Sequence, residues 1–182
     1  MLDTENVLLV HRAGRPPTYA FPASEVEGSG LVSEPEEDAE GYVRVAWDQA
    51  DEWWEEDEQV FGHPRNPYHR VDCLTTSRRL HVECAGTVLV DTTQTIGVYE
   101  TSLPPRLYVA RAQVDDSVLV PSTTSTYCPY KGTASYWSAV VGETIVDDVA
   151  WSYEDPLPES SAIRGCLSFD DTKVTLLADL PA

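Results

Sequence analysis

Positively charged residues are scarce in this sequence. Its 182 residues include 12 Lys plus Arg against 31 Asp plus Glu, which gives a formal net charge of −19. Affinity for a nucleic-acid backbone comes from Lys and Arg side chains that displace counterions, and anionic membrane surfaces attract the same cations. The composition therefore argues against nucleic-acid and membrane partners, and we expect a small-molecule substrate or ligand instead.

Long apolar runs are missing as well. No stretch approaches the ~20 apolar residues that a membrane-spanning helix needs. The first residues, Met1 to Glu5, lack the positive charge and apolar core of a signal peptide. We therefore expect a cytoplasmic protein, and the excess of Arg over Lys, ten to two, suggests a bacterial source with a GC-rich genome.

Metal-ligand spacing is a third absence. The four cysteines form no Cys-x-x-Cys pair and the four histidines show no ligand spacing; these residues are Cys73, Cys84, Cys128, Cys166, His11, His63, His69 and His81. A zinc site needs clustered ligands of this kind, and disulfides are rare in a reducing compartment. We expect no bound metal, no cofactor, and four reduced thiols that mostly fill the core.

Hydrophobic residues make up 42% of the chain, enough for a substantial core. Runs rich in β-branched and aromatic residues predict strands separated by Pro, Gly or Asp pairs; they cover residues 79–84, 87–91, 95–99, 107–112, 135–141, 144–151 and 173–177. Ala85-Gly86 predicts a hairpin turn. The expected fold is mainly β, with short antiparallel strands in a barrel, a sandwich or folded-over sheets. Helical periodicity is weak and confined to residues 41–58.

Acidic residues are concentrated early in the chain: twelve lie between Glu34 and Glu58, opposed there only by Arg44. Residues 33–41 contain five acids with Pro and Gly, which predicts a solvated, mobile loop. Residues 51–58 also contain two adjacent tryptophans. This run is either a short helix or turn that buries one indole, or an edge that presents its acids to an arginine of the same fold.

A faint internal repeat suggests how the chain is organised. Pro16-Pro17 and Glu25-Val26 recur as Pro104-Pro105 and Gln113-Val114, at an offset of 88 residues. We interpret residues 1–72 as a shortened, degenerate first copy that carries the acidic loop, and residues 73–182 as a complete copy that carries the functional site.

The densest unusual stretch is Cys128-Pro129-Tyr130-Lys131-Gly132, which predicts a tight loop that closes onto a strand. In that strand Gly132, Ala134 and Tyr136 share one face, where small residues beside a large one leave room for a ligand. Trp151 and Tyr153 lie two residues apart and also share a face.

Each candidate residue has a structural alternative. Cys128 is either a core thiol or a nucleophile, because reactivity requires an exposed, cationic setting. Arg106 follows two prolines and either pairs with Glu100 or offers its planar guanidinium to an anion. Trp151 and Tyr153 are either core aromatics or walls of a pocket. A rigid arginine loop and the lysine loop in one small domain together favour an anion-binding pocket with aromatic walls.

Several motifs carry a resemblance to a known family. They are Glu100, residues 103–108 (Leu-Pro-Pro-Arg-Leu-Tyr), residues 126–132 (Thr-Tyr-Cys-Pro-Tyr-Lys-Gly), residues 134–137, residues 150–153 and Pro156, with 54–60 and 63–72 upstream. The chain resembles the bacterial domain-of-unknown-function family 427, whose label is nucleotidyltransferase. The resemblance implies a β-tent-like fold of folded antiparallel sheets with at most one or two short helices, without the zinc cysteines of other β-tents.

The sequence does not independently support nucleotidyl transfer. That chemistry uses carboxylates that hold Mg²⁺ beside a glycine-rich phosphate loop, and no such loop pattern is present. We instead predict a metal-independent enzyme that cyclises, isomerises or hydrolyses a bacterial biosynthetic intermediate. The predicted catalytic residues are Lys131, Glu100, Tyr108 and Tyr136, and the predicted substrate-binding residues are Arg106, Cys128, Tyr130, Trp151 and Tyr153. A non-catalytic module that binds a small molecule or a protein is the alternative, and a nucleotidyltransferase is a second.

Two substitutions test the predicted pocket. We expect Lys131→Ala and Arg106→Ala to abolish binding or turnover while leaving the fold largely intact, because a ligand anion between the two cations relieves their repulsion. Cys128→Ala should have a milder effect.

Overall fold

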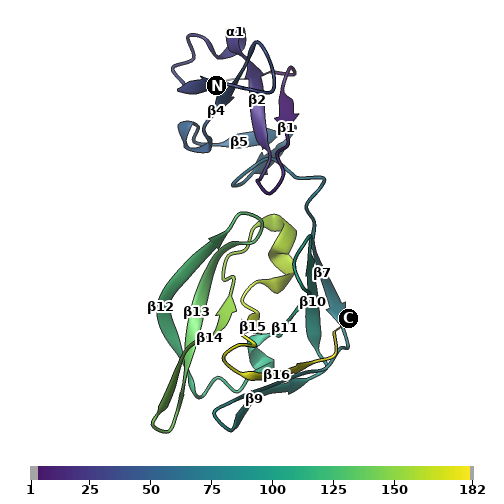
Figure 1. Ribbon diagram of the computed structural model, residues 1–182, viewed down its shortest axis with the longest axis vertical. Coiled ribbons are helices and arrows are strands. Elements are labelled where there is room, and N and C mark those ends of the chain that lie inside the picture. The colour runs from purple at the N-terminus through teal and green to yellow at the C-terminus, as the bar shows by residue number, and fades with distance from the viewer. Residues whose placement is uncertain (1–3, 181–182) are drawn as a thin grey trace. The chain divides into compact units, whose positions relative to one another are not determined.

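The chain forms two compact units, Met1–Pro67 and Tyr68–Ala182, in a computed structural model that describes residues 4–180 (Figure 1). The boundary between the units, after Pro67, lies five residues before the boundary that the sequence suggests, after residue 72. No helix in the described part of the chain is long and apolar enough to cross a membrane. The prediction of a mainly β fold with short antiparallel strands and few short helices is confirmed.

The first unit contains a four-stranded antiparallel sheet in the order β1-β2-β4-β3 and a small hairpin, β5-β6. Its elements are β1 (Leu8–Val10), β2 (Thr18–Pro22), α1 (Ala23–Val26), β3 (Ser33–Pro35), β4 (Tyr42–Val45), η1 (Trp47–Gln49), β5 (Trp53–Glu55) and β6 (Glu58–Val60). Phe21, Val26 and Val45 form its small buried core.

The acidic segment 33–41 is in part the solvated loop that its composition predicts: residues 36–41 form no strand or helix, and all residues of the segment except 36 and 39 are exposed. Residues 33–35, however, form β3, paired with β4, so that Glu34 lies opposite Arg44 and contacts its guanidinium at 3.2 Å. Glu36 is buried, and its carboxylate accepts a hydrogen bond from Arg12, which also contacts Asp38 at 2.9 Å. Three of the acids are therefore paired with two arginines, Arg44 from the neighbouring strand and Arg12 from a more distant position in the chain.

The predicted helical period over residues 41–58 is also wrong, because strands β4, β5 and β6 and a single 3-10 turn occupy this range. Trp53 packs against two other rings, with centroid distances of 5.7 Å to Tyr19 and 4.8 Å to Trp47. Trp54 points outward and is 55% exposed. The indole of Trp53 is therefore partly buried, and the run 51–58 forms a hairpin with a turn instead of a helix. One acid of the same run, Glu58, also contacts an arginine, Arg65.

The second unit contains three antiparallel sheets, in the orders β11-β10-β7, β12-β13-β14-β15 and β16-β8-β9. Its elements are β7 (Val71–Thr76), β8 (Leu80–Cys84), β9 (Thr87–Thr92), β10 (Thr95–Glu100), β11 (Arg106–Tyr108), η2 (Arg111–Gln113), β12 (Leu119–Cys128), β13 (Gly132–Val141), β14 (Thr144–Ser152), η3 (Pro158–Ile163), β15 (Leu167–Phe169) and β16 (Thr175–Ala178). The β8-β9 hairpin turns at Ala85-Gly86, as predicted; both residues have positive φ.

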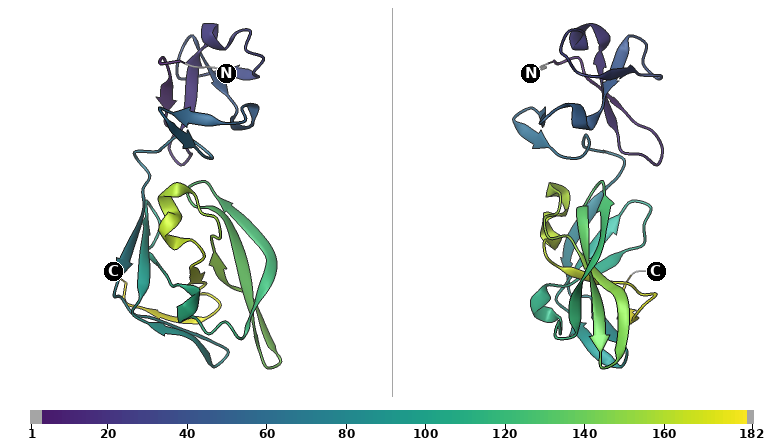
Figure 2. Two further views of the ribbon diagram at one scale, coloured as in Figure 1. Left: turned by 180° about the vertical axis from the view of Figure 1, so that it is seen from behind. Right: turned by 90° about the vertical axis from the view of Figure 1, so that its left-hand side faces the viewer.

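Two hydrophobic clusters hold these sheets together. One joins β8, β9, β13, β14 and β15 around Leu80, Val149 and Phe169. The other lies between the β11-β10-β7 sheet and the β12-β13-β14-β15 sheet and includes Tyr108, Tyr130 and Tyr153. In Figure 1 and in the left view of Figure 2 these two sheets stand apart, and η3 (yellow-green) lies between them. We call this second group the inter-sheet cluster.

The proposed repeat has a structural parallel in the order of elements. In each unit a Pro-Pro pair precedes a strand that pairs antiparallel with the strand before it, and a short helical turn follows: β2 and α1 in the first unit, β11 and η2 in the second. The interpretation of residues 1–72 as a shortened copy of residues 73–182 remains a proposal.

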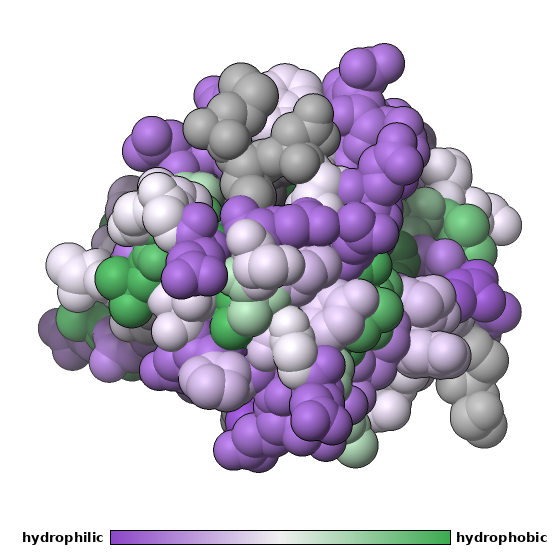
Figure 3. Space-filling model, turned by 90° about the horizontal axis from the view of Figure 1, so that it is seen from above, coloured by the Kyte–Doolittle hydropathy of each residue, from purple (hydrophilic) through white to green (hydrophobic). Residues whose placement is uncertain are grey.

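Hydrophilic side chains dominate the face of the molecule in Figure 3, in keeping with the net charge of −19.

Candidate functional site

Strand register brings several predicted site residues to one face of the β11-β10-β7 sheet. Val98 lies opposite Arg106 on one side and Cys73 on the other. Because directly opposed residues share a face and side chains alternate along a strand, Tyr108 and Glu100 lie on that same face. Buried Tyr108 belongs to the inter-sheet cluster.

The facing sheet contributes the remaining predicted residues. The loop Pro129–Lys131 joins β12 to β13, and Tyr136 on β13 lies opposite Trp151 on β14. Alternation then places Tyr153 on the same face as Trp151. Ala134, Tyr136, Trp151 and Tyr153 all belong to or pack against the inter-sheet cluster, as the sequence pattern predicts for a shared face.

Lys131 and Glu100 form an ion pair across the two sheets. Their side chains are only 10% and 8% exposed, respectively. Removal of two charges from water costs several kcal/mol per ion unless each finds a partner. Lys131 therefore does not project into solvent, and its ammonium group is held against the Glu100 carboxylate.

His69 completes this group and is the residue that the sequence analysis missed. Its Nε2 lies 3.1 Å from the second carboxylate oxygen of Glu100, and its ring stacks on Tyr130 with centroids 3.7 Å apart and planes 12° apart. His69 precedes β7 by two residues, so it lies on the strand face that carries Val71 and Cys73. His69 lies in the segment 63–72 that contributes to the family resemblance, and it precedes an alternating strand by two residues, but neither feature distinguishes it as a site residue.

Tyr108, Trp151 and Arg106 form a second group beside the ion pair. The indole Nε1 of Trp151 donates to the Tyr108 hydroxyl oxygen at 2.9 Å, and the two rings meet edge to face. The Arg106 guanidinium lies 5.6 Å from the centre of the Trp151 ring. Its ion-pair partner is Asp171, at 3.3 Å, rather than Glu100, the partner considered from the sequence.

The buried phenols are held in their neutral form. Burial raises the pKa of Tyr108 well above its ordinary value of 10, and the hydrogen bond from Trp151 only partly opposes this effect. Burial likewise raises the pKa of Tyr153, with a further contribution from the nearby Tyr108 phenol. Both groups therefore keep their hydroxyl protons at neutral pH and can donate a hydrogen bond, but they do not act as bases.

Tyr136 and the thiols lie at the edge of the same cluster. The Tyr136 hydroxyl is 3.0 Å from the hydroxyl of Thr126. All four cysteines are free thiols, and Cys73, Cys128 and Cys166 border or belong to the inter-sheet cluster. Burial raises the pKa of the Cys73 and Cys166 thiols, which makes them poor nucleophiles.

The structure thus places six of the nine predicted residues in or against the inter-sheet cluster: Tyr108, Tyr130, Tyr136, Cys128, Trp151 and Tyr153. The Lys131–Glu100 ion pair adjoins this cluster through His69, which contacts Glu100 and stacks on Tyr130, and Arg106 lies over Trp151. The two predicted cations have different carboxylate partners, Glu100 for Lys131 and Asp171 for Arg106. Within residues 4–180 no three His, Cys, Asp or Glu side chains converge as potential metal ligands.

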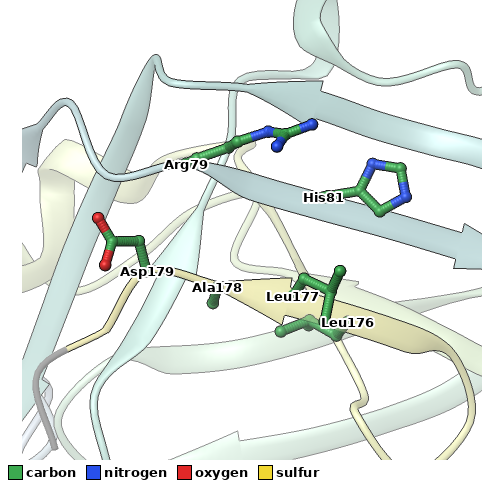
Figure 4. A pocket seen from close by; sticks show the side chains of 6 residues that line it. All are labelled: Arg79, His81, Leu176, Leu177, Ala178 and Asp179. Atoms are coloured by element: carbon green, nitrogen blue, oxygen red, sulfur yellow. The ribbon is translucent and has the colours of Figure 1, made fainter.

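A surface hollow of about 530 Å³ lies elsewhere in the second unit, between β8 and β16 (Figure 4). Arg79 directly precedes β8 and His81 lies on it, beside Leu176 and Leu177 of β16. The Arg79 guanidinium already makes two 2.8 Å hydrogen bonds to Asp91. This hollow therefore offers no free cation, and we locate the candidate site at the Lys131–Glu100 pair, where charge is buried.

A comparison with protein-family models matches residues 72–179 to the domain of unknown function DUF427. The match covers more than half of the chain and includes all nine predicted site residues, although it begins after His69. The comparison with curated proteins finds no match. On this evidence the chain belongs to the DUF427 family.

Proposed function

We propose that this protein is an enzyme that transfers a proton within a small carbonyl or carboxylate compound. The observation that carries the proposal is the buried ion pair of Lys131 and Glu100, whose carboxylate also contacts His69. Buried ionisable groups with a specific partner are more frequent in functional sites than elsewhere. A purely structural ion pair does not need the additional histidine, which itself stacks on Tyr130 of the inter-sheet cluster.

The roles follow from charge and position. The Lys131 ammonium group binds the carbonyl oxygen of the substrate, which makes the hydrogen on the adjacent carbon more acidic. The Glu100 carboxylate takes that hydrogen as a proton, the electron pair of the C–H bond forms a C=C bond, and the carbonyl oxygen becomes an enolate. Return of the proton to another carbon completes an isomerisation, and attack by the enolate on a second group gives a cyclisation.

His69 is a positioning residue in this scheme. Its contact with the far oxygen of Glu100 holds the carboxylate in one orientation, so that the oxygen near Lys131 faces the substrate. General acid–base groups held in this way contribute typically 10²–10⁴-fold to a rate. The Trp151 and Tyr153 rings provide the apolar surround that keeps water from the proton in transit.

Deuterium exchange tests the proposal across a range of compounds and does not require an identified substrate. A panel of small ketones, keto acids and carboxylic acids is incubated in D₂O with the protein and followed by NMR. We expect at least one compound to exchange or rearrange, at a rate reduced about 100-fold or more by Glu100→Gln or Lys131→Met. Tyr127→Phe is the matched control, because Tyr127 is 62% exposed.

Two results would contradict the proposal. Compounds that bind at this site but never exchange or react would indicate a binding module. Mg²⁺-dependent conversion of a nucleotide, lost in the same variants, would favour the chemistry that the family label names.

A further inference from the structure

We propose that the hydroxyl groups of Tyr108 and Tyr153 form a donor pair that binds the enolate oxygen of an enolisable keto acid. The inference rests on the proposed function and specifies its substrate class. It concerns the step after proton removal, when negative charge has moved from the Glu100 carboxylate to the substrate oxygen. Lys131 binds that oxygen from one side, and further donors aimed at it stabilise the developing charge more strongly in a site that excludes water.

The first observation is that two hydroxyl protons of the inter-sheet cluster have no protein acceptor in the part of the chain that the structure describes. Tyr108 is 2% exposed, and its hydroxyl oxygen accepts the hydrogen bond from Trp151. Tyr153 is 6% exposed, and its hydroxyl is not one of the fully buried unpaired atoms of the described residues. Within residues 4–180 neither hydroxyl donates a hydrogen bond to a protein group. Both protons are therefore available to a ligand oxygen.

The second observation is that the two phenols come from facing sheets. Tyr108 lies on β11, and Tyr153 directly follows β14 and pairs through a single bridge with Arg164. Both belong to the inter-sheet cluster. A ligand atom between the sheets can therefore receive one hydrogen bond from each side.

The third observation is that Trp151 sets the direction of the Tyr108 donor. Its Nε1 group occupies one lone pair of the Tyr108 oxygen at 2.9 Å. The hydroxyl proton must then point away from the indole, in one of the remaining directions around the oxygen. Such preorganisation lets a donor stabilise developing charge without reorientation during the reaction.

The charges around the pair favour an anion that forms during the reaction. Each phenol stays neutral at physiological pH because burial opposes its ionisation, so each can donate. Lys131 lies in the turn between β12 and β13, directly before Gly132, and supplies a positive charge. Tyr153 follows β14 of the same sheet. The ligand class that fits is a small, planar keto acid.

Oxalate is a suitable probe, because it is a planar anion that resembles the enolate of a 2-oxo acid and cannot react. Oxamide, a neutral molecule of similar shape, is the control ligand. Binding to the full-length protein is measured by isothermal titration calorimetry for the wild type and for Tyr108→Phe, Tyr153→Phe and Tyr127→Phe. Thermal unfolding of each variant shows whether the fold is retained.

We expect oxalate to bind, with affinity reduced about tenfold or more in each of Tyr108→Phe and Tyr153→Phe, since each variant removes one hydrogen bond to the anion. Tyr127→Phe should bind like the wild type, and oxamide should bind weakly to all four proteins. Absence of oxalate binding by the wild type, or equal affinity in the phenylalanine variants, would overturn the inference.

The exchange experiment separates this inference from the proposed function. Proton exchange that is lost in Glu100→Gln but unaffected in both phenylalanine variants would support the function and overturn the donor pair. Oxalate binding that depends on both phenols, in a protein that exchanges no compound of the panel, would support the donor pair and overturn the proton transfer.

Discussion

At the scale of single residues, the buried pair of Lys131 and Glu100 dominates the energetics of the site. Each side chain is about nine-tenths buried, so neither charge is screened by solvent. The sequence alone led us to expect that Lys131→Ala would leave the fold intact. The burial of Glu100 changes that expectation, because loss of the Lys131 ammonium group leaves the Glu100 carboxylate buried without a counterion. We therefore expect substitutions of Lys131 to destabilise the fold.

We predict that Lys131→Met lowers the free energy of unfolding by about 3–5 kcal/mol, and that the double variant Lys131→Met/Glu100→Gln recovers most of this loss. Urea unfolding measures both effects. Lys173→Met is the control, since Lys173 lies 3.8 Å from Asp170 and is 35% exposed, and it should cost less than about 1 kcal/mol. A single variant as stable as the wild type would show that the pair does not contribute to stability.

At the scale of elements, the β12-β13 hairpin controls where Lys131 lies. Gly132 has a φ of +93°, a conformation that side-chain-bearing residues rarely adopt. A Cβ at this position would meet its nearest neighbour, the Asp155 carbonyl oxygen, at 3.5 Å, so the obstacle is backbone strain and not space. The glycine therefore lets the chain turn directly after the lysine.

We predict that Gly132→Ala lowers the free energy of unfolding by about 1–2 kcal/mol and weakens oxalate binding, because relief of the strain moves Lys131. Gly142→Ala, at another positive-φ turn with open space around it, is the matched control. It should lower stability without a change in affinity. Equal effects on affinity from both variants would mean that the hairpin does not position the lysine.

The acidic segment of the first unit makes a second prediction at this scale. Burial opposes ionisation of Glu36, but the amide of Asp38 and the guanidinium of Arg12 more than offset it, so the pKa of Glu36 is lowered. A carboxylate with a lowered folded pKa stabilises the fold above its ordinary pKa of 4.5, and this contribution is lost as the pH falls through the lower, folded value.

We therefore expect Glu36→Gln to lower the melting temperature of the first unit at pH 7, by an amount that shrinks as the pH falls below 4.5. Thermal scans between pH 7 and pH 3 measure this difference. Glu37→Gln is the control, because Glu37 is exposed. A pH-independent difference between wild type and Glu36→Gln would contradict the assigned role of the Arg12 contact.

At the scale of the whole molecule, the two units have separate cores. Every side chain of the candidate site, His69 included, belongs to the unit Tyr68–Ala182. The family match begins three residues after His69. A boundary drawn from family similarity alone would therefore remove a group that contacts Glu100.

We predict that a fragment of residues 68–182 folds, binds oxalate and unfolds cooperatively, whereas a fragment of residues 73–182 is less stable and binds more weakly. The shorter fragment lacks His69 and the first residues of β7, including buried Val71. Circular dichroism and calorimetry compare the two fragments with the full chain. Equal stability and affinity would show that His69 has no part in the site.

Local sequence patterns determined much of the second unit. Alternation of apolar and polar residues located most of its strands, Ala85-Gly86 located a hairpin, and the Cys-Pro-Tyr-Lys-Gly loop located the lysine of the site. These features depend on neighbours in the chain, so the sequence is sufficient to identify them.

Tertiary structure alone decided which charges meet. Glu36 pairs with Arg12, and Glu100 pairs with Lys131 and His69, each across 24 residues or more. An acidic run with no local counterion is typical of a solvated loop, and a histidine before a strand carries no signal of its own. Only strand register and sheet packing bring their partners close, because an ion pair in a protein interior depends on distance in space and not on separation along the chain.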